Sequence, residues 1–86
     1  MKDHAKKLTI TFAYNGETHV DEVPPDQRIE GVWHKVLAHF GIRPEDAAAL
    51  GLFKDGSELS RDQSFEQAGV ADGATLHIRP RQQRAG

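Results

Sequence analysis

The sequence predicts a small α+β fold in which a mixed sheet of four to five strands packs on one helix, in the order ββαββ(β). Three observations predict it. Two alternating segments flank Asn15-Gly16, a segment of helical periodicity follows, and short strand-like segments separated by glycine turns complete the chain. At 86 residues, the chain has room for one hydrophobic core and no deep cleft.

The segment 75–79 is the clearest predicted strand, and the rest of the fold is expected to pack on it. Leu76 and Ile78 alternate with polar residues, so these two side chains should face the core while His77 faces away. Pro80 ends the strand, because proline brings no N–H group to a sheet ladder.

The first two strands are predicted to form a hairpin around Asn15-Gly16, a pair of residues typical of tight turns. A strict two-residue turn would place His19 opposite Phe12 and bury a polar group on the core face. A three-residue loop with a bulge would place Val20 there instead. We therefore expect the bulged register, since a one-residue shift turns the opposite face of a strand inward.

The only predicted amphipathic helix has apolar residues spaced at i, i+3, i+4 and i+7, namely Ile29, Val32, Trp33, Val36, Leu37 and Phe40. Asp26 is its predicted N-cap, Gly41 should end it, and Pro44 should open a short helical turn. Two interpretations of Trp33 stay open, a packing residue and an exposed binding anchor.

Composition argues against several classes of function. The net charge of −2 argues against a nucleic-acid partner. The absence of cysteine removes disulfides and thiolate chemistry and suits a reducing, cytoplasmic location. The first residues are charged and lack the apolar core of a signal peptide, and no apolar run approaches the ~20 residues of a membrane span. We expect a cytoplasmic monomer with no membrane partner.

Neither a metal site nor an active site is expected. His34 and His39 are five positions apart on the predicted helix and so occupy different faces, unlike a helical ligand pair. The serines and carboxylates at 57–62 are typical of turns, and no nucleophile elbow or phosphate-binding glycine motif is present. We therefore expect no catalytic residues, no metal and no cofactor, and a protein that is not an enzyme.

Several of these residues resemble those of ubiquitin and its relatives, the β-grasp family. Residues 59–75 align with ubiquitin without a gap, and Thr75-Leu76-His77 is identical to ubiquitin's triplet. Four residues fall on its buried apolar positions, which are Leu59, Phe65, Val70 and Leu76. The resemblance covers about residues 7–81, with about three extra residues between Ile42 and Leu52. It implies a flexible N-terminus at 1–6, a ubiquitin-like domain at 7–80 and a flexible basic tail at 81–86.

The resemblance also implies how the tail is used. Ubiquitin's tail arginine, which activating enzymes recognise, falls on Arg81, while its two terminal glycines fall on Arg84 and Ala85. The chain continues to Gly86. In this it is similar to bacterial ubiquitin-like proteins that lack a terminal glycine pair. The resemblance thus implies a protein modifier served by activating and conjugating enzymes, with a non-conjugated interaction domain as the alternative and a sulfur carrier third.

Ubiquitin's recognition patch is changed in this sequence. Its isoleucine falls on Phe53, its histidine on His77 and its valine on Arg79, so an aromatic and cationic surface is expected to contact protein partners. The lysines that carry ubiquitin's two commonest chains are replaced, which leaves Lys35 and Lys54 as candidate acceptor lysines within the domain.

Overall fold

The computed structural model describes residues 7–81. In this range the elements are β1 (Leu8–Tyr14), β2 (Glu17–Val23), α1 (Ile29–Phe40), α2 (Pro44–Ala47), β3 (Leu50–Lys54), β4 (Ser57–Glu58) and β5 (Thr75–Pro80). The predicted α+β class and element order are confirmed, with a sheet of five strands. The predictions of a flexible N-terminus at 1–6 and a flexible tail at 81–86 fall outside the described residues, apart from Arg81.

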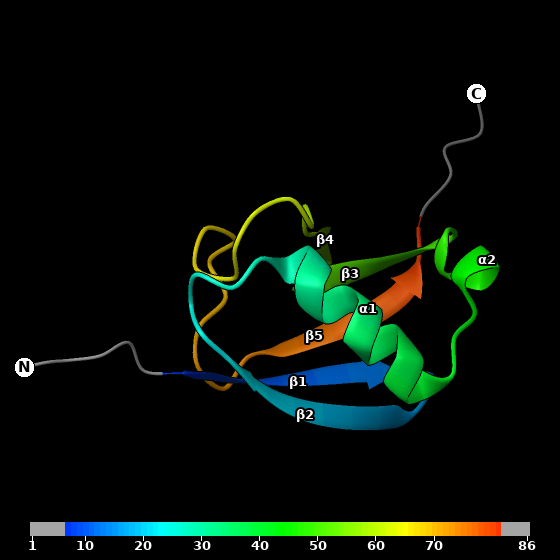
Figure 1. Cartoon of the computed structure of the whole chain (residues 1–86), viewed down its shortest axis with the longest axis horizontal. Helices are drawn as coiled ribbons and strands as arrows, with labels where there is room; N and C mark the ends of the chain where they lie inside the picture. Colours follow the sequence, from blue (N-terminus) through cyan, green and yellow to red (C-terminus); the bar gives the residue numbers. More distant parts are fainter. Residues whose placement is uncertain (1–6, 82–86) are drawn as a thin grey trace, which may run out of the picture.

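The sheet is built around β5, in the order β2-β1-β5-β3-β4. β5 runs parallel to β1, with Phe12 opposite Leu76, and antiparallel to β3, with Leu52 opposite Ile78. α1 lies across one face of this sheet (Figure 1). Leu76 and Ile78 are buried beneath the helix, as the alternation predicts.

The core lies between α1 and the sheet, where apolar side chains from both surfaces meet. Its fully buried large side chains are Phe12, Phe65, Ile10, Ile29, Leu52, Leu76 and Val36. Trp33 is only 4% exposed, which supports the packing interpretation for most of its side chain. Leu59, expected at a buried position, is only partly buried against this core.

The register predicted for the β1–β2 hairpin is wrong. The turn has two residues, with φ of 52° at Asn15 and 85° at Gly16, and His19 pairs with Phe12. Positive φ at both turn positions defines a type I′ turn, whose twist matches that of the flanking strands. Val20 therefore points away from the helix and is 57% exposed.

His19, the polar residue that a two-residue turn places opposite Phe12, is not fully buried, because β2 is an edge strand. His19 faces the helix side but remains half-buried. Its ring stacks on that of His39 near the end of α1, with centroids 3.8 Å apart and an interplanar angle of 28°. The bulged register was preferred because burying His19 would cost desolvation energy. A partly solvated imidazole avoids most of that cost.

The predicted N-cap of α1 is also wrong, since the helix begins at Ile29 and Asp26 lies outside it. No side chain caps this end. The N–H groups of Ile29 and Glu30 instead donate to the carbonyl oxygens of Gln63 and Arg61, at 3.0 and 3.1 Å. A distant loop thus satisfies donors that a capping side chain would otherwise serve.

Pro80, expected to end the strand 75–79, is itself the last residue of β5 and lies opposite Leu50. Two other predicted boundaries are confirmed. Gly41 ends α1 in the left-handed conformation with φ of 72°. Pro44 occupies the first turn of α2, a four-residue helix. Within residues 7–81, no helix is long and apolar enough to cross a membrane.

Candidate functional site

The outer face of the sheet, on the side away from α1, brings together the three residues expected to contact partners. Side chains alternate along a strand, so Phe53 of β3 and His77 and Arg79 of β5 all point away from the buried face. Phe53 lies directly opposite His77 in the ladder, and Arg79 lies opposite Gly51. Side chains opposite one another in this way have Cβ atoms about 4.5–5.5 Å apart. We call Phe53, His77 and Arg79 the outer-face triad.

The exposure of the triad suits contact with another protein. Phe53 and His77 are half-buried, so each is supported by its neighbours and still presents surface to solvent, while Arg79 is exposed. On the β1 side His77 lies opposite Ala13, whose small side chain leaves space beside the imidazole. An apolar ring beside a guanidinium can bind a partner that offers an apolar side chain and a carboxylate.

Arg81 follows the end of β5 and is tied back to the sheet. Its N–H donates to the carbonyl oxygen of Ala49 at 2.8 Å. Its Nε lies 2.9 Å from Oε2 of Glu58, in an ion pair whose side chains are 49% and 37% exposed. Because both groups meet solvent, this pair contributes about 0–1 kcal/mol and can open readily.

The Glu58 and Arg81 side chains lie close over the backbone of Gly51. A Cβ atom at position 51 would lie 2.7 Å from Oε2 of Glu58 and 3.1 Å from Cγ of Arg81. Sequence reasoning missed Glu58 and Gly51 as neighbours of the tail. A glycine inside a strand often marks a place where other groups approach closely. Gly51 was therefore the one feature of the sequence that indicated a contact here.

The remaining candidate residues are not gathered in one place. Arg84, Ala85 and Gly86 lie outside the described residues. Lys35 is exposed on α1, whereas Lys54 ends β3 and its Nζ lies 3.4 Å from a carboxylate oxygen of Asp55. Among residues 7–81 there is no group of three or more His, Cys, Asp or Glu residues that could hold a metal ion.

A five-stranded mixed sheet grasping one helix, with an arginine at the root of its C-terminal segment, defines the ubiquitin-like class of β-grasp proteins. Within that class, the family model of BilA ubiquitin-like domain 2 matches residues 9–69. The match spans more than half of the chain. The chain therefore belongs to the BilA ubiquitin-like domain 2 family.

Solved structures agree with the ubiquitin-like fold. A de novo protein designed on the basis of ubiquitin is 28% identical, with a TM-score of 0.75 over 94% of this chain and 96% of the design. The ubiquitin of Caldiarchaeum subterraneum is 24% identical, with a TM-score of 0.73 over 92% and 99% of the two chains. The UBL domain of Plasmodium falciparum Dsk2 is 25% identical, with a TM-score of 0.70 over 84% and 95%. A search of curated proteins by sequence found no significant match.

Proposed function

We propose that this domain is a ubiquitin-like protein modifier, or a modifier-like protein, attached or recognised through its C-terminal tail. The observation that carries the proposal is Arg81, whose guanidinium lies at the root of the tail and, among residues 7–81, is paired only with the half-exposed Glu58. An activating enzyme with a carboxylate at the matching position could pair with this guanidinium in place of Glu58, because breaking the exposed ion pair costs little free energy. The domain acts in the cytoplasm as a monomer and catalyses nothing itself.

In this proposal Gly86 supplies the carboxylate that is joined to a lysine amine. Forming that amide bond removes water, so the carboxylate must first be activated by an enzyme that consumes a nucleotide. Ala85 and Gly86 are small enough to enter a narrow catalytic channel, and Arg84 adds a second cation for tail recognition. Lys35 and Lys54 are the candidate acceptors should the modifier be joined to itself.

The outer-face triad would then be the surface that other proteins recognise once the modifier is attached. It lies on the sheet rather than on the tail, so tail recognition and face recognition can be separated by mutation. Phe53→Ala should weaken partner binding and leave the fold intact, because the ring is half-buried on the outer face rather than packed in the core.

A non-conjugated interaction domain is the alternative function. It is favoured by Ala85, which stands where ubiquitin has its last glycine, and by the likeness to a UBL domain. A sulfur carrier, which would end in a thiocarboxylate, ranks third because that chemistry also favours a terminal glycine pair.

The deciding experiment expresses the N-terminally tagged chain in its native host and analyses boiled, reduced extracts by blot and mass spectrometry. Boiling and reduction remove thioesters and non-covalent complexes, so heavier tagged species report amide conjugates. A modifier gives such species with Gly86 on a target lysine, and deletion of Gly86 abolishes them.

Controls in the same experiment separate the alternatives. Phe53→Ala should still be conjugated, since the tail is unchanged. If only the free 86-residue chain appears and deletion of Gly86 leaves partner binding unchanged, the interaction-domain function replaces the modifier. A thiocarboxylate on the free chain, found by its mass, would instead identify a sulfur carrier.

A further inference from the structure

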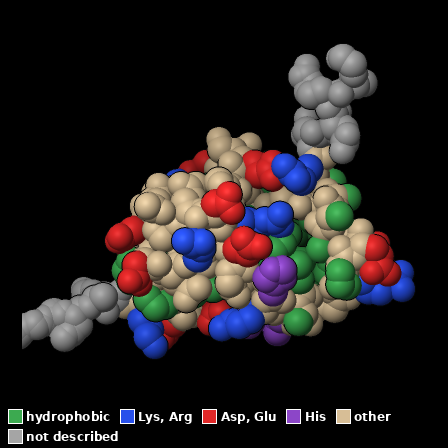
Figure 2. All heavy atoms as spheres, turned by 45° about the horizontal axis from the view of Figure 1, so that its top comes forward, with side chains coloured by type: hydrophobic (Ala, Val, Ile, Leu, Met, Phe, Trp, Pro, Cys, Tyr) green, Lys and Arg blue, Asp and Glu red, His purple; other side chains and the backbone are tan. Residues whose placement is uncertain are grey.

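A groove of about 410 Å³ opens on the helix side of the domain, away from the outer-face triad. Hydrophobic side chains gather on this face (Figure 2). The groove runs between α1, α2 and the loop that carries Arg61, and its apolar lining consists of Trp33, Leu37, Ile42, Pro44, Ala47 and Ala48. Its volume is at the small end of ligand sites, which suits one or two side chains of a partner rather than a large cofactor.

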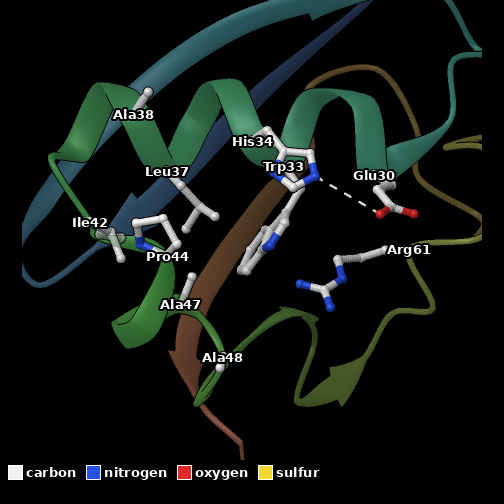
Figure 3. Close-up of a pocket in the computed structure, with 10 residues that line it drawn as sticks. All are labelled: Glu30, Trp33, His34, Leu37, Ala38, Ile42, Pro44, Ala47, Ala48 and Arg61. Carbon is white, nitrogen blue, oxygen red and sulfur yellow. Dashed lines mark ion pairs between the residues drawn. The ribbon is translucent and has the colours of Figure 1, made fainter.

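The groove exists because a large side chain faces small ones. In Figure 3 the indole of Trp33 points from α1 into the groove, with Arg61 on one side and Leu37 and Pro44 on the other. α2 has only four residues and presents alanines to this space. Neither element fills the gap, so apolar surface stays open to solvent at a place where a partner's apolar side chain would bury it.

Arg61 gives the groove a cation that an acidic partner can reach. The guanidinium carbon of Arg61 lies 4.8 Å from the centre of the Trp33 ring, a cation–π distance. Stacking uses the flat face of the guanidinium and leaves its N–H groups available around the edge. Within residues 7–81 the Arg61 side chain makes no ion pair or side-chain hydrogen bond.

Glu30 is the acid that lines the groove, and its carboxylate faces His34 rather than Arg61. The Oε2 atom of Glu30 lies 3.9 Å from Nε2 of His34, one turn further along α1. The backbone carbonyl of Arg61 accepts a hydrogen bond from the N–H of Glu30 at 3.1 Å. This bond fixes the main chain of Arg61 against α1, and the Trp33 ring is the contact of its side chain.

We propose that this groove binds a linear acidic–aliphatic peptide segment of a protein partner. One aliphatic side chain of the segment packs on the exposed part of the groove lining, Pro44 and Ala48, and a neighbouring aspartate or glutamate pairs with the N–H edge of Arg61. The proposal does not depend on conjugation, and the groove and the outer-face triad can be occupied together because they lie on opposite sides of the sheet.

Two occupants from this chain fit the groove less well. The segment Gln82-Gln83-Arg84-Ala85-Gly86 has no large apolar side chain and carries a cation, which mismatches both the apolar lining and Arg61. A second copy would need a protruding apolar anchor. Among residues 7–81 the exposed large hydrophobic residue is Val20, on the edge strand β2, where it points away from the helix side.

The test selects ligands for the full 86-residue chain from a displayed library of random 12-residue peptides without tryptophan. The chain has a single tryptophan, so titration of its fluorescence reports directly on the groove. Selected peptides should share an aliphatic residue close to an aspartate or glutamate. Replacing that acid by its amide should weaken binding about tenfold, as expected for a charge-assisted hydrogen bond.

Matched variants assign the peptide to the groove. Ala38→Gln adds bulk at an exposed, groove-lining position of α1 and should weaken binding at least tenfold, whereas Lys35→Gln, exposed on α1 outside the lining, should not. Arg61→Gln should abolish the preference for the acidic peptide over its amide. Denaturation of each variant confirms that the fold is intact.

Four results would overturn the proposal. The first is a selection with no enriched peptide, and the second is equal binding of the acidic and amide peptides to the unmodified chain. The third is equal binding to Ala38→Gln and the unmodified chain, which would move the site elsewhere. If sedimentation shows a dimer that Ala38→Gln dissociates, the occupant is a second copy and the peptide proposal is wrong.

Discussion

Replacing Leu76 by alanine should remove about 3–5 kcal/mol from the free energy of unfolding. Leu76 is 0% exposed and lies on β5, the central strand of the sheet. Truncation removes apolar contacts and leaves a cavity. β5 is held by β1 on one side and β3 on the other, so the backbone cannot readily move to fill that cavity, which places the cost in the upper part of the usual range.

This loss is large for a domain of this size. At about 0.05–0.15 kcal/mol per residue, 86 residues give a total stability of about 4–13 kcal/mol. With a urea dependence of about 1 kcal/mol per molar, typical of small domains, the unfolding midpoint of Leu76→Ala should fall by about 3–5 M. A domain at the low end of that stability range would be unfolded at room temperature.

Urea titration followed by the fluorescence of Trp33 measures this change, since the indole is buried in the folded state. The matched control is His77→Ala, on the next residue of the same strand but on the outer face. Its half-buried side chain lies opposite Phe53 on one side and the small side chain of Ala13 on the other, so its loss should cost about 1 kcal/mol or less. A near-neutral Leu76→Ala, or an equal loss in both variants, would refute the assignment of the two faces of β5.

Three further substitutions test single features of the fold by the same titration. Gly31→Ala should stabilise α1 by up to about 1 kcal/mol, because the new methyl group meets only the flexible end of Gln27, 2.8 Å away; a loss would show that Gln27 cannot move. Gly16→Ala should cost about 1–2 kcal/mol because φ is +85°. A Cβ there would meet nothing within 4 Å, so the cost comes from the backbone conformation alone, and a neutral result would contradict the type I′ turn. Val20→Lys should change stability by less than about 0.5 kcal/mol, whereas a loss of several kcal/mol would restore the bulged register.

Much of the fold could be predicted because its strongest patterns are local. The alternation in 75–79 and the helical spacing in 29–40 correspond to β5 and α1. The hairpin register failed because the rule against burying a polar side chain was applied to β2 as though it were an inner strand. At an edge, His19 stays partly solvated, and the turn preference of Asn15-Gly16 decides the register.

Part of the candidate site could likewise be predicted from the sequence and part could not. The outer-face triad could be predicted, since strand alternation and the resemblance to ubiquitin both assign its residues to one face. The pair between Glu58 and Arg81 could not, because 23 residues separate its partners and only the folded sheet brings them together. The groove was missed for the same reason, since Trp33, α2 and Arg61 meet only after α1 is capped by the distant loop.

Under the proposed function, the ion pair beside Gly51 would link binding at the tail to binding at the outer-face triad. Glu58 lies opposite Phe53 in the β3–β4 ladder, so a partner that takes Arg81 leaves an uncompensated carboxylate beside the outer-face triad. If the proposed function holds, a ligand bound at Phe53 would sense whether the tail is engaged, and by reciprocity the affinity for the tail would respond to that ligand by the same factor. The strength of an exposed ion pair, about 1 kcal/mol at most, limits this factor to about fivefold.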